Sequence, residues 1–299
     1  MPIIYTLVIT GIIIIAIISL WTTFQPYINP KIVWTHWDTA AMPDLCRLNL
    51  ARTRRILHDW DVRFFTKADF LKWCPPADLP PGLEALSKQH QADFMRLWLL
   101  KKHGGTWIDS SIVLNQSINP IYNECVKSKA ECSGFYIEGK TTDPRWPVFE
   151  NWFIMAPANS RIIALWLEEY TQAITKGFQN YKQQAQKDGV HFHTLFDSDD
   201  DVYLTQHLCF QKVIQKQLWW PATIKYRKAE DTMFYFHKLC NWEGDCMKLQ
   251  FQSPQATKVP YIKLRGGDRD LFPLSYFNEP SKGEDATKAI DHQVRWLLN

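Results

Sequence analysis

The chain has 299 residues, of which 46% are hydrophobic, so it can bury a large core as one domain, with or without a subdomain. This composition excludes a disordered protein. Its 34 Lys and Arg residues nearly balance its 31 Asp and Glu residues, for a formal net charge of +3. Nucleic-acid binders usually carry a much larger basic excess, so we expect no nucleic-acid partner.

The first predicted element is a transmembrane helix. Residues 3–21 carry no charged side chain, and such a helix would be about 28 Å long, close to the thickness of the hydrocarbon core of a bilayer. A cleaved signal peptide, the alternative, would usually have a basic start and a small-residue cleavage site, which this segment lacks. We therefore expect an anchor over residues 1–24, with membrane contact through residues 3–24, and a proline-bounded linker over residues 25–30.

The orientation of this anchor is poorly determined by charge, because Lys31 is the only basic side chain near it. We expect a single-pass membrane protein with a Golgi-type lumenal orientation. A domain that faces the cytoplasm is the alternative.

A globular domain is expected over residues 31–275, followed by a C-terminal tail over residues 276–299. Its first predicted elements are a strand over residues 31–37, a helix over residues 43–57 and a strand over residues 62–66. A β-α-β start of this kind is typical of parallel sheets, whose sites lie at the carboxyl ends of the strands. Residues 67–81 contain two Pro-Pro pairs and are predicted to be irregular.

A helix that ends at two glycines and leads into a buried strand is predicted next. Gly104 and Gly105 supply the left-handed conformations that end helices, and Asp109 lies on the strand that follows. A buried carboxylate there needs a partner, and a divalent metal ion is a natural one. The helix is predicted from leucines at roughly helical spacing, and the strand from apolar residues: Leu83, Leu86, Leu97, Leu100, Trp107, Ile108, Ile112 and Val113.

Asp93 and Arg96 lie three residues apart on this helix and so share one face. From their spacing alone, an exposed salt bridge worth a few tenths of a kcal/mol is the simpler interpretation. Their place in the motif described below favours a role in binding.

Later elements are predicted as a strand over residues 149–156, a helix from Asn159 or Ser160 through Ile174, and a polar helical extension over residues 179–188. A helix over residues 202–217 and a strand over residues 257–264 follow. The Gly266-Gly267 pair after that strand suits either the hinge of a lid or a surface turn.

The seven cysteines show no zinc-ligand spacing, and most are expected to be buried thiols. In an oxidising lumen, Cys125 with Cys132 and Cys240 with Cys246 are close enough in sequence to form disulfides, and the odd count leaves at least one thiol free. Asn115 begins a glycosylation sequon, but its position directly after the central strand makes a glycan hard to place.

Four sequence blocks carry a resemblance to a known family. The block from Ala92 to Asp109, with its Asp-x-x-Arg, Gly-Gly and Trp-x-Asp spacing, is similar to the central motif of capsular polysaccharide synthesis-type glycosyltransferases, relatives of the DXD sugar transferases. Residues 30–38, 150–156 and 201–207 resemble flanking blocks of the same group. The resemblance covers roughly residues 30–265.

The resemblance implies an α/β fold of the GT-A type, a nucleotide-sugar-binding mixed sheet flanked by helices. It also implies a nucleotide-sugar donor, a glycan or other hydroxyl acceptor, retention at the anomeric carbon, and Mn²⁺ or Mg²⁺ as cofactor. The expected donor-binding residues are Trp34, Thr35, Asp93, Arg96, Ser111, Lys263 and Arg265. Of these, Trp34 and Thr35 would line the base pocket, and Lys263 and Arg265 would reach the phosphates.

For the chemistry, the resemblance implies catalytic roles for Asp93, Asp109, Glu150 and Asn151. Glu150, Asn151 or Asp201 could sit at the reactive face of the sugar, and His207 is expected in the core or facing the acceptor. Asp109 would bind the metal, with His237 or Asn241 beyond it to complete the shell; for His237, a core or exposed histidine is the alternative.

One departure is Ser111, which stands where the DXD triplet has its second aspartate. It leaves a metal with fewer protein charges and puts strict metal dependence in doubt. The sequence therefore predicts a hexosyltransferase, and the alternative is a non-catalytic glycan- or nucleotide-binding protein with a degenerate site.

Overall fold

The computed structural model describes residue 27 and residues 29–193, 196, 202–218 and 222–277. The predicted anchor over residues 1–24 lies outside this part, as do residues 278–299 of the predicted tail. None of the helices in the described part has the length and apolar character needed to cross a membrane.

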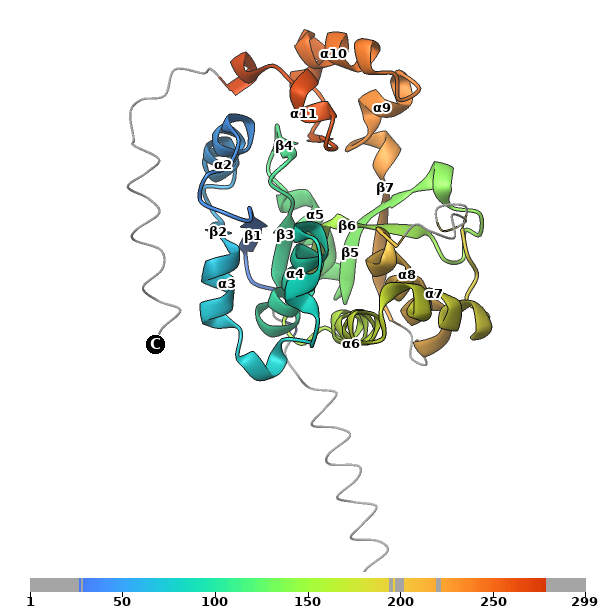
Figure 1. Cartoon of the computed structure of the whole chain (residues 1–299). Coiled ribbons are helices and arrows are strands. Elements are labelled where there is room, and N and C mark those ends of the chain that lie inside the picture. The colour runs from blue at the N-terminus through green and yellow to red at the C-terminus, as the bar shows by residue number, and fades with distance from the viewer. Residues whose placement is uncertain (1–26, 28, 194–195, 197–201, 219–221, 278–299) are drawn as a thin grey trace, which may run out of the picture.

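Six strands form a mixed central sheet in the order β2-β1-β3-β6-β5-β7 (Figure 1). Strand β1 pairs in parallel with β2 and β3, β6 runs antiparallel to β3 and β5, and β7 is parallel to β5. The predicted parallel start is confirmed, so the carboxyl ends of β1, β2 and β3 meet at one edge. The strands are β1 (Ile32–His36), β2 (Asp61–Phe65), β3 (Gly105–Ile108), β5 (Cys132–Ile137), β6 (Val148–Ala156) and β7 (Ile224–Lys228).

Helices flank this sheet because successive strand side chains point to opposite faces. Trp34 packs in one core cluster with α3 (Lys67–Trp73), α4 (Lys88–His103), α6 (Arg161–Lys176), α7 (Phe178–Lys187) and α8 (Thr205–Lys212). Its neighbour Val33 packs in a second cluster with α5 (Asn119–Ser128) and the segment that precedes α9 (Tyr235–Leu239). The fold is therefore an α/β structure with a mixed six-stranded sheet, as predicted.

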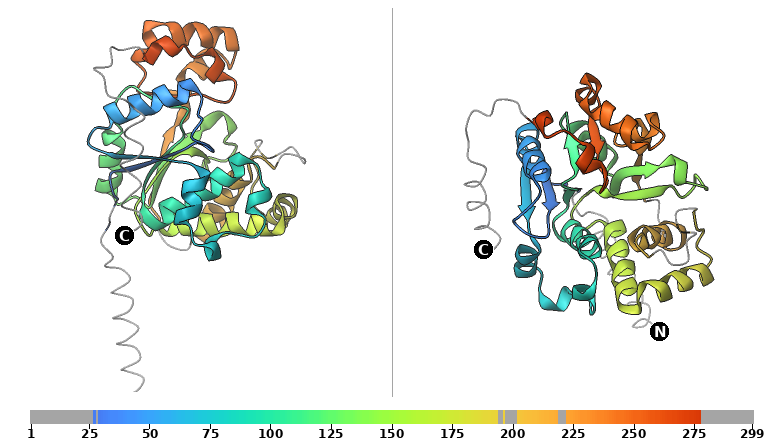
Figure 2. Two further views of the ribbon diagram at one scale, coloured as in Figure 1. Left: turned by 60° about the vertical axis from the view of Figure 1, so that its left-hand side comes forward. Right: turned by 45° about the horizontal axis from the view of Figure 1, so that its top comes forward.

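A third cluster joins α2 (Asp44–Ile56) to a small sheet and the C-terminal helices. The small sheet pairs β4 (Ile112–Leu114) with β8 (Tyr261–Lys263) in antiparallel fashion. Helices α9, α10 (Gly244–Gln252) and α11 (Asp268–Leu271) gather at one end of the molecule beside β4 (Figures 1 and 2). Phe277, two residues beyond the predicted end of the domain, packs in the same cluster.

Helix starts follow from local capping. Ser87 accepts a hydrogen bond from the His90 amide at the start of α4, and Ser160 accepts one from Ile163 at the start of α6, as predicted. Thr66 and Asp69 form a capping box that begins α3. The prediction of irregular structure over residues 67–81 was therefore wrong for residues 67–73.

Several other boundaries differ from the predictions. Leu83 and Leu86 precede α4, because Leu83 begins a 3₁₀ turn (Leu83–Ala85) and Ser87 caps the helix. The strand predicted through Trp107 and Val113 divides into β3 and β4, which belong to different sheets. The polar extension after α6 is the separate helix α7, and helix α5, strands β5 and β7 and the C-terminal helices α9, α10 and α11 were not predicted.

Candidate active site

The turn from α4 into β3 brings the central motif together. Gly104 has φ 67° and Gly105 has φ 97°, in the region that L side chains rarely adopt. A Cβ at Gly104 would lie 2.4 Å from the backbone nitrogen of Ala158, so only glycine allows this close approach. The chain reverses there, and β3 delivers Asp109 to the edge of the sheet beside α4.

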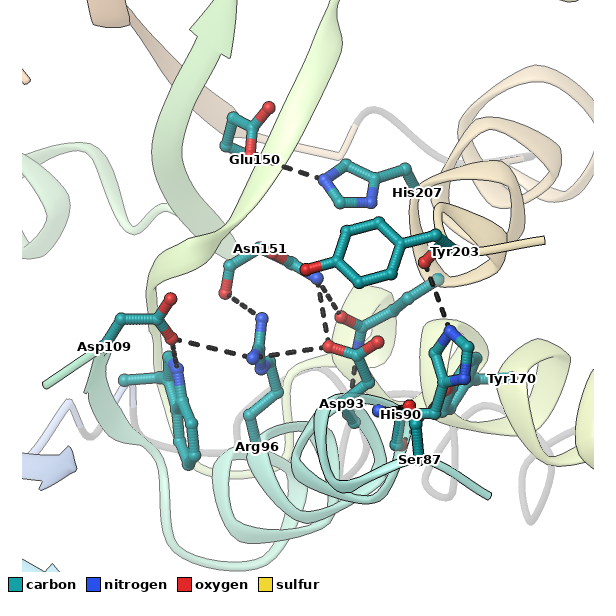
Figure 3. A network of polar contacts seen from close by, with 12 residues as sticks. Ser87, His90, Asp93, Arg96, Asp109, Glu150, Asn151, Tyr170, Tyr203 and His207 are labelled. Carbon is teal, nitrogen blue, oxygen red and sulfur yellow. Dashed lines mark hydrogen bonds and ion pairs between the residues drawn. The ribbon is translucent and has the colours of Figure 1, made fainter. Parts of the chain in front are cut away.

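Arg96 joins two carboxylates at this edge (Figure 3). Its Nη2 lies 3.3 Å from Oδ1 of Asp93 and 3.6 Å from Oδ1 of Asp109, and its guanidinium stacks over the Trp107 ring. Trp107 Nε1 also donates to Asp109 Oδ1 at 2.9 Å. The Asp93 and Arg96 side chains are only 8% and 7% exposed, so this pair is not the exposed salt bridge that spacing alone suggested.

Strand β6 and helix α8 hold the other side of this network. The Asn151 carbonyl accepts from Arg96 Nη1 at 2.8 Å, and its side-chain amide donates to Asp93 Oδ1 at 3.1 Å (Figure 3). Gln206 accepts from the same amide at 2.6 Å and donates to the Asp93 carbonyl, also at 2.6 Å. The predicted site residues Asp93, Arg96, Asp109 and Asn151 therefore lie in one network, and Gln206 is a member that the sequence analysis did not identify.

Lys263 of β8 reaches the same site from the small sheet. Its Nζ donates to Asp109 Oδ2 at 2.7 Å and to Ser111 Oγ at 3.0 Å. The backbone fixes this approach, because Leu264 N donates to the Ser111 carbonyl and Lys263 lies opposite Ile112 in the ladder. The first and third positions of the DXD-like triplet thus share one lysine ammonium.

The turn between β3 and β4 is held by Asn49 of α2. Its side-chain amide donates to the carbonyls of Ser110 and Ile112 at 3.0 and 2.7 Å. A small cavity of about 10 Å³, with room for about one water molecule, is lined by Thr35, Asn49 and Asp109 among others. The predicted donor residue Thr35 therefore lies next to the site.

The two carboxylates differ in their electrostatic surroundings. Burial raises the pKa of Asp93, an effect that the positive charge of Arg96 opposes. Burial would also raise the pKa of Asp109, but Lys263 and Arg96 lower it below its usual value. Asp109 therefore stays ionised at neutral pH and keeps its charge at the edge where a ligand would meet it.

Comparison with known proteins identifies the family of this chain. Residues 21–241 match the model of the capsular polysaccharide synthesis protein family, which is most of the chain. The chain belongs to the capsular polysaccharide synthesis protein family. The family resemblance seen in the motif is therefore confirmed.

Two curated relatives of this chain are named as O-glycosyltransferases. O-glycosyltransferase braB of Annulohypoxylon truncatum is 30% identical over 171 residues, which cover 50% of this chain and 39% of that protein. O-glycosyltransferase PaGT of Phomopsis amygdali is 23% identical over 185 residues, which cover 57% of this chain and 44% of that protein. The chain thus spans less than half the length of either relative.

Among solved structures, a glycosyltransferase involved in glycosylation of the major capsid of PBCV-1 matches with a TM-score of 0.42 and 12% identity. The match covers 82% of this chain and 98% of that glycosyltransferase. The galactosyltransferase LgtC, solved with donor and acceptor sugar analogs, also matches with a TM-score of 0.42, at 8% identity. This match covers 82% of this chain and 93% of LgtC.

Glu150 and His207 form a separate pair beside the network around Arg96. The Glu150 side chain is 10% exposed, and its Oε2 lies 3.4 Å from Nε2 of His207 (Figure 3). His207 is thus buried, one of its two predicted placements. Asp201, the other residue proposed for the reactive face of the sugar, lies outside the described residues.

Trp34 does not take its predicted role. Its side chain is fully buried, its Nε1 donates to the Gly104 carbonyl at 2.9 Å, and Arg63 stacks over the ring. Because no part of the indole is exposed, it cannot line a base pocket in this structure. Its polar contact instead fixes the end of α4.

His237 takes the core placement that was the alternative to its role as a metal ligand. It is fully buried, and its Nε2 lies 2.8 Å from Oδ2 of Asp268. Arg265 contacts the same carboxylate at 3.1 Å through Nε and stacks over Trp242. His237 therefore helps to hold the C-terminal helices together through Asp268. Asn241, which follows it, is exposed and has a left-handed conformation with φ 45°.

Asp109 and Ser111 fit a divalent metal poorly. Both Asp109 Oδ2 and Ser111 Oγ already accept from the Lys263 ammonium, and Asp109 Oδ1 faces Trp107 and Arg96. The part of the chain that the structure describes contains no group of three or more His, Cys, Asp and Glu side chains suited to hold a metal ion. The site instead surrounds one ionised carboxylate with two cations.

The two missed contributors, Asn49 and Gln206, act through amide side chains. An amide carries no charge and no fixed motif spacing, so neither was distinguishable from an ordinary helix residue. For Gln206 a signal existed, because it lies within the block 201–207 that resembles the family.

The structure also shows which cysteines are bonded and what the Asn115 side chain of the sequon contacts. Cys240 and Cys246 form a disulfide, whereas Cys125 and Cys132, the other candidate pair, are the buried free thiols expected of most cysteines. The Asn115 amide donates to the carbonyls of Ala256 and Val259 at 2.8 and 2.6 Å. A glycan on Asn115 would remove these bonds, in agreement with the expectation that none is placed there.

Proposed function

We propose that this protein is a glycosyltransferase of the GT-A type that moves a hexose from a nucleotide-diphosphate sugar to a glycan or other hydroxyl acceptor, with retention at the anomeric carbon. Membership of the capsular polysaccharide synthesis protein family supports this proposal, as do the names of the two curated relatives. The mixed sheet with parallel strands β1, β2 and β3 at the site suits a nucleotide ligand at their carboxyl ends.

The observation that carries the proposal is the network of Asp93, Arg96, Asp109 and Lys263. It places two cations around one carboxylate of low pKa at the carboxyl edge of the sheet. Departure of a nucleoside diphosphate builds negative charge, which fixed cations stabilise more strongly in the transition state than in the bound donor.

The transfer step has a simple balance. The bond from the anomeric carbon to the diphosphate oxygen breaks, and its electron pair stays on the diphosphate. The acceptor oxygen forms the new bond to the anomeric carbon, and its proton passes to the released diphosphate. The cations keep their protons throughout, so their role is electrostatic.

Asn151 and Glu150 are the candidates for contact with the sugar. The Asn151 amide already orients Asp93. The pair is therefore pre-organised for sugar hydroxyls, with the Asp93 carboxylate to accept hydrogen bonds and the Asn151 amide to donate them. Glu150, paired with His207, offers a second polar group one residue away on β6.

We also propose that residues 3–24 anchor the protein in a membrane with the domain on the lumenal side. The apolar composition of residues 3–21 supports the anchor. The Cys240–Cys246 disulfide supports an oxidising compartment.

Replacement of Asp109 tests the catalytic proposal. We expect Asp109→Ala to lower the rate of nucleotide release from the preferred nucleotide sugar by at least about 10²-fold, because the cations lose the carboxylate that positions them. The measurement is a screen of UDP-, GDP-, ADP-, CDP- and dTDP-hexoses with water or sugars as acceptors, using the purified full chain.

Asp59→Ala is the matched control, because Asp59 pairs with Lys31 on the surface at 2.6 Å. This variant should keep the wild-type rate. An Asp109→Ala protein with full activity would contradict the assignment. Wild-type protein that binds nucleotide sugars but never turns them over would favour the non-catalytic alternative.

A further inference from the structure

Lys263 occupies the position that a metal ion would need. Its ammonium lies 2.7 Å from Asp109 Oδ2 and 3.0 Å from Ser111 Oγ, the two side chains of the DXD-like triplet. A divalent ion at the same oxygens would have to displace this charge. Ser111 offers a neutral hydroxyl, so the ion would gain one carboxylate where a DXD triplet offers two.

The ammonium is held firmly in this place. The Lys263 side chain is 10% exposed, its backbone N–H donates to the Met233 carbonyl at 2.9 Å, and β8 is registered on β4. Displacement of the ammonium would leave a buried charge without its partner, which costs several kcal/mol. Lys263 is therefore a structural part of the site.

The geometry also leaves the lysine able to bind a ligand. An ammonium has three N–H donors, and two of them have partners among the described residues, Asp109 and Ser111. Asp109 is 25% exposed, so the pair meets solvent at the edge of the sheet. Arg96 supplies a second cation 3.6 Å from the other oxygen of the same carboxylate.

We infer that Lys263 replaces the metal ion, and that its third donor stabilises the diphosphate oxygen on which the electron pair collects when the glycosidic bond breaks. This inference rests on the proposed glycosyltransferase function. Lys263 stays protonated and gives no proton to the diphosphate. Transfer therefore requires no divalent ion.

The first test uses wild-type protein alone. The full chain is treated with EDTA, and donor hydrolysis is compared with and without Mn²⁺ or Mg²⁺. We expect less than a twofold change in kcat. Loss of turnover in EDTA that Mn²⁺ restores would overturn the inference and leave the proposed function intact.

A second readout does not depend on turnover. Binding of ADP, CDP, GDP, UDP and dTDP is titrated in EDTA and in Mn²⁺, and bound Mn²⁺ is followed by electron paramagnetic resonance. We expect one diphosphate to bind in EDTA, with no Mn²⁺ bound beyond the amount that the nucleotide itself holds. Binding that requires Mn²⁺ would refute the role of Lys263. Absence of any diphosphate binding in either condition would refute the proposed function as well.

Replacement of the lysine tests its charge. We expect Lys263→Met to lower kcat by about 10²-fold or more and to weaken diphosphate binding at least about tenfold, with no rescue by Mn²⁺, whereas Lys263→Arg keeps part of both. Lys228→Met is the control and should change neither, because Lys228 lies on β7 and pairs with Glu138. If Lys263→Met fails to fold, Lys263→Gln, which keeps an N–H donor for Asp109 but removes the charge, gives the same measurement. A kcat near that of wild type in either variant would contradict the inference.

Discussion

At the residue scale, burial decides what an ion pair does. Arg96 and Asp93 are three residues apart on α4, and Arg47 and Asp44 are three apart on α2. The first pair is 7% and 8% exposed and the second 55% and 67%. Exposed pairs contribute little to stability, whereas loss of one partner from a buried pair leaves an uncompensated charge.

We therefore expect Arg96→Met to lower the free energy of unfolding by about 3 to 5 kcal/mol at pH 8. The cost should be smaller at pH 5. Burial already raises the pKa of Asp93, and loss of Arg96 raises it further, so the folded state prefers protonated Asp93 and loses stability as pH rises through that pKa. Urea denaturation at several pH values measures both effects.

Arg47→Met is the matched control. Its pair with Asp44 is exposed, so the variant should lie within about 1 kcal/mol of wild type at every pH. Equal losses in the two variants, or a loss in Arg96→Met that does not change with pH, would argue against a buried charge on Asp93.

At the element scale, the turn from α4 to β3 sets the position of the carboxylates. Helix α4 carries Asp93 and Arg96, and β3 ends just before Asp109. The elements face each other because Gly104 takes a conformation with φ 67° and ψ −161° against the backbone of Ala158. The indole of Trp34 donates to the Gly104 carbonyl and holds the same turn.

Gly104→Ala should therefore destabilise the fold by roughly 1 to 3 kcal/mol or more, because backbone strain adds to a backbone clash. Gly266→Ala is the control: its φ is not positive, and a Cβ there would meet nothing within 4 Å. Thermal unfolding should show a lower Tm for Gly104→Ala and no loss for Gly266→Ala. A Gly104→Ala protein as stable as wild type would show that the turn can relax.

At the scale of the whole molecule, the site depends on contacts between distant segments. Asp93, Asn151, Gln206 and Lys263 come from α4, β6, α8 and β8. The last of these strands is held by the third core cluster, which also contains α9 and α10 and the Cys240–Cys246 disulfide.

We expect reduction of this disulfide to lower the free energy of unfolding by about 2 kcal/mol, the chain-entropy value for a short loop closed across a separation of 6 residues. Thermal unfolding with and without dithiothreitol measures the loss, and a Cys240→Ser/Cys246→Ser variant should not respond to the reductant. Alkylation without reduction should leave both cysteines unmodified. Full alkylation of both in protein purified under native conditions would contradict the disulfide.

Much of the site was predictable because it lies in one local block. Asp93, Arg96 and Asp109 were identified from their spacing with the Gly104-Gly105 turn, and all three meet in the structure. Trp34 was expected in a base pocket but is buried, and His237 takes the core placement that was the alternative to a metal ligand. A sequence does not show that an indole is fully buried or that a histidine has Asp268 as its partner. Strands β5 and β7 were missed, since their burial depends on neighbouring strands rather than on local periodicity.

Local sequence was enough to predict β1, α2, β2, the turn after α4 and the family, because hydrophobic period, capping residues and glycine conformations act over a few residues. Which cation contacts Asp109 depends instead on how distant segments pack. Lys263 lies 154 residues further along the chain, and the pairing of β4 with β8 brings its ammonium to the carboxylate. Side-chain contacts across that distance depend on strand register and core packing, which local sequence does not specify.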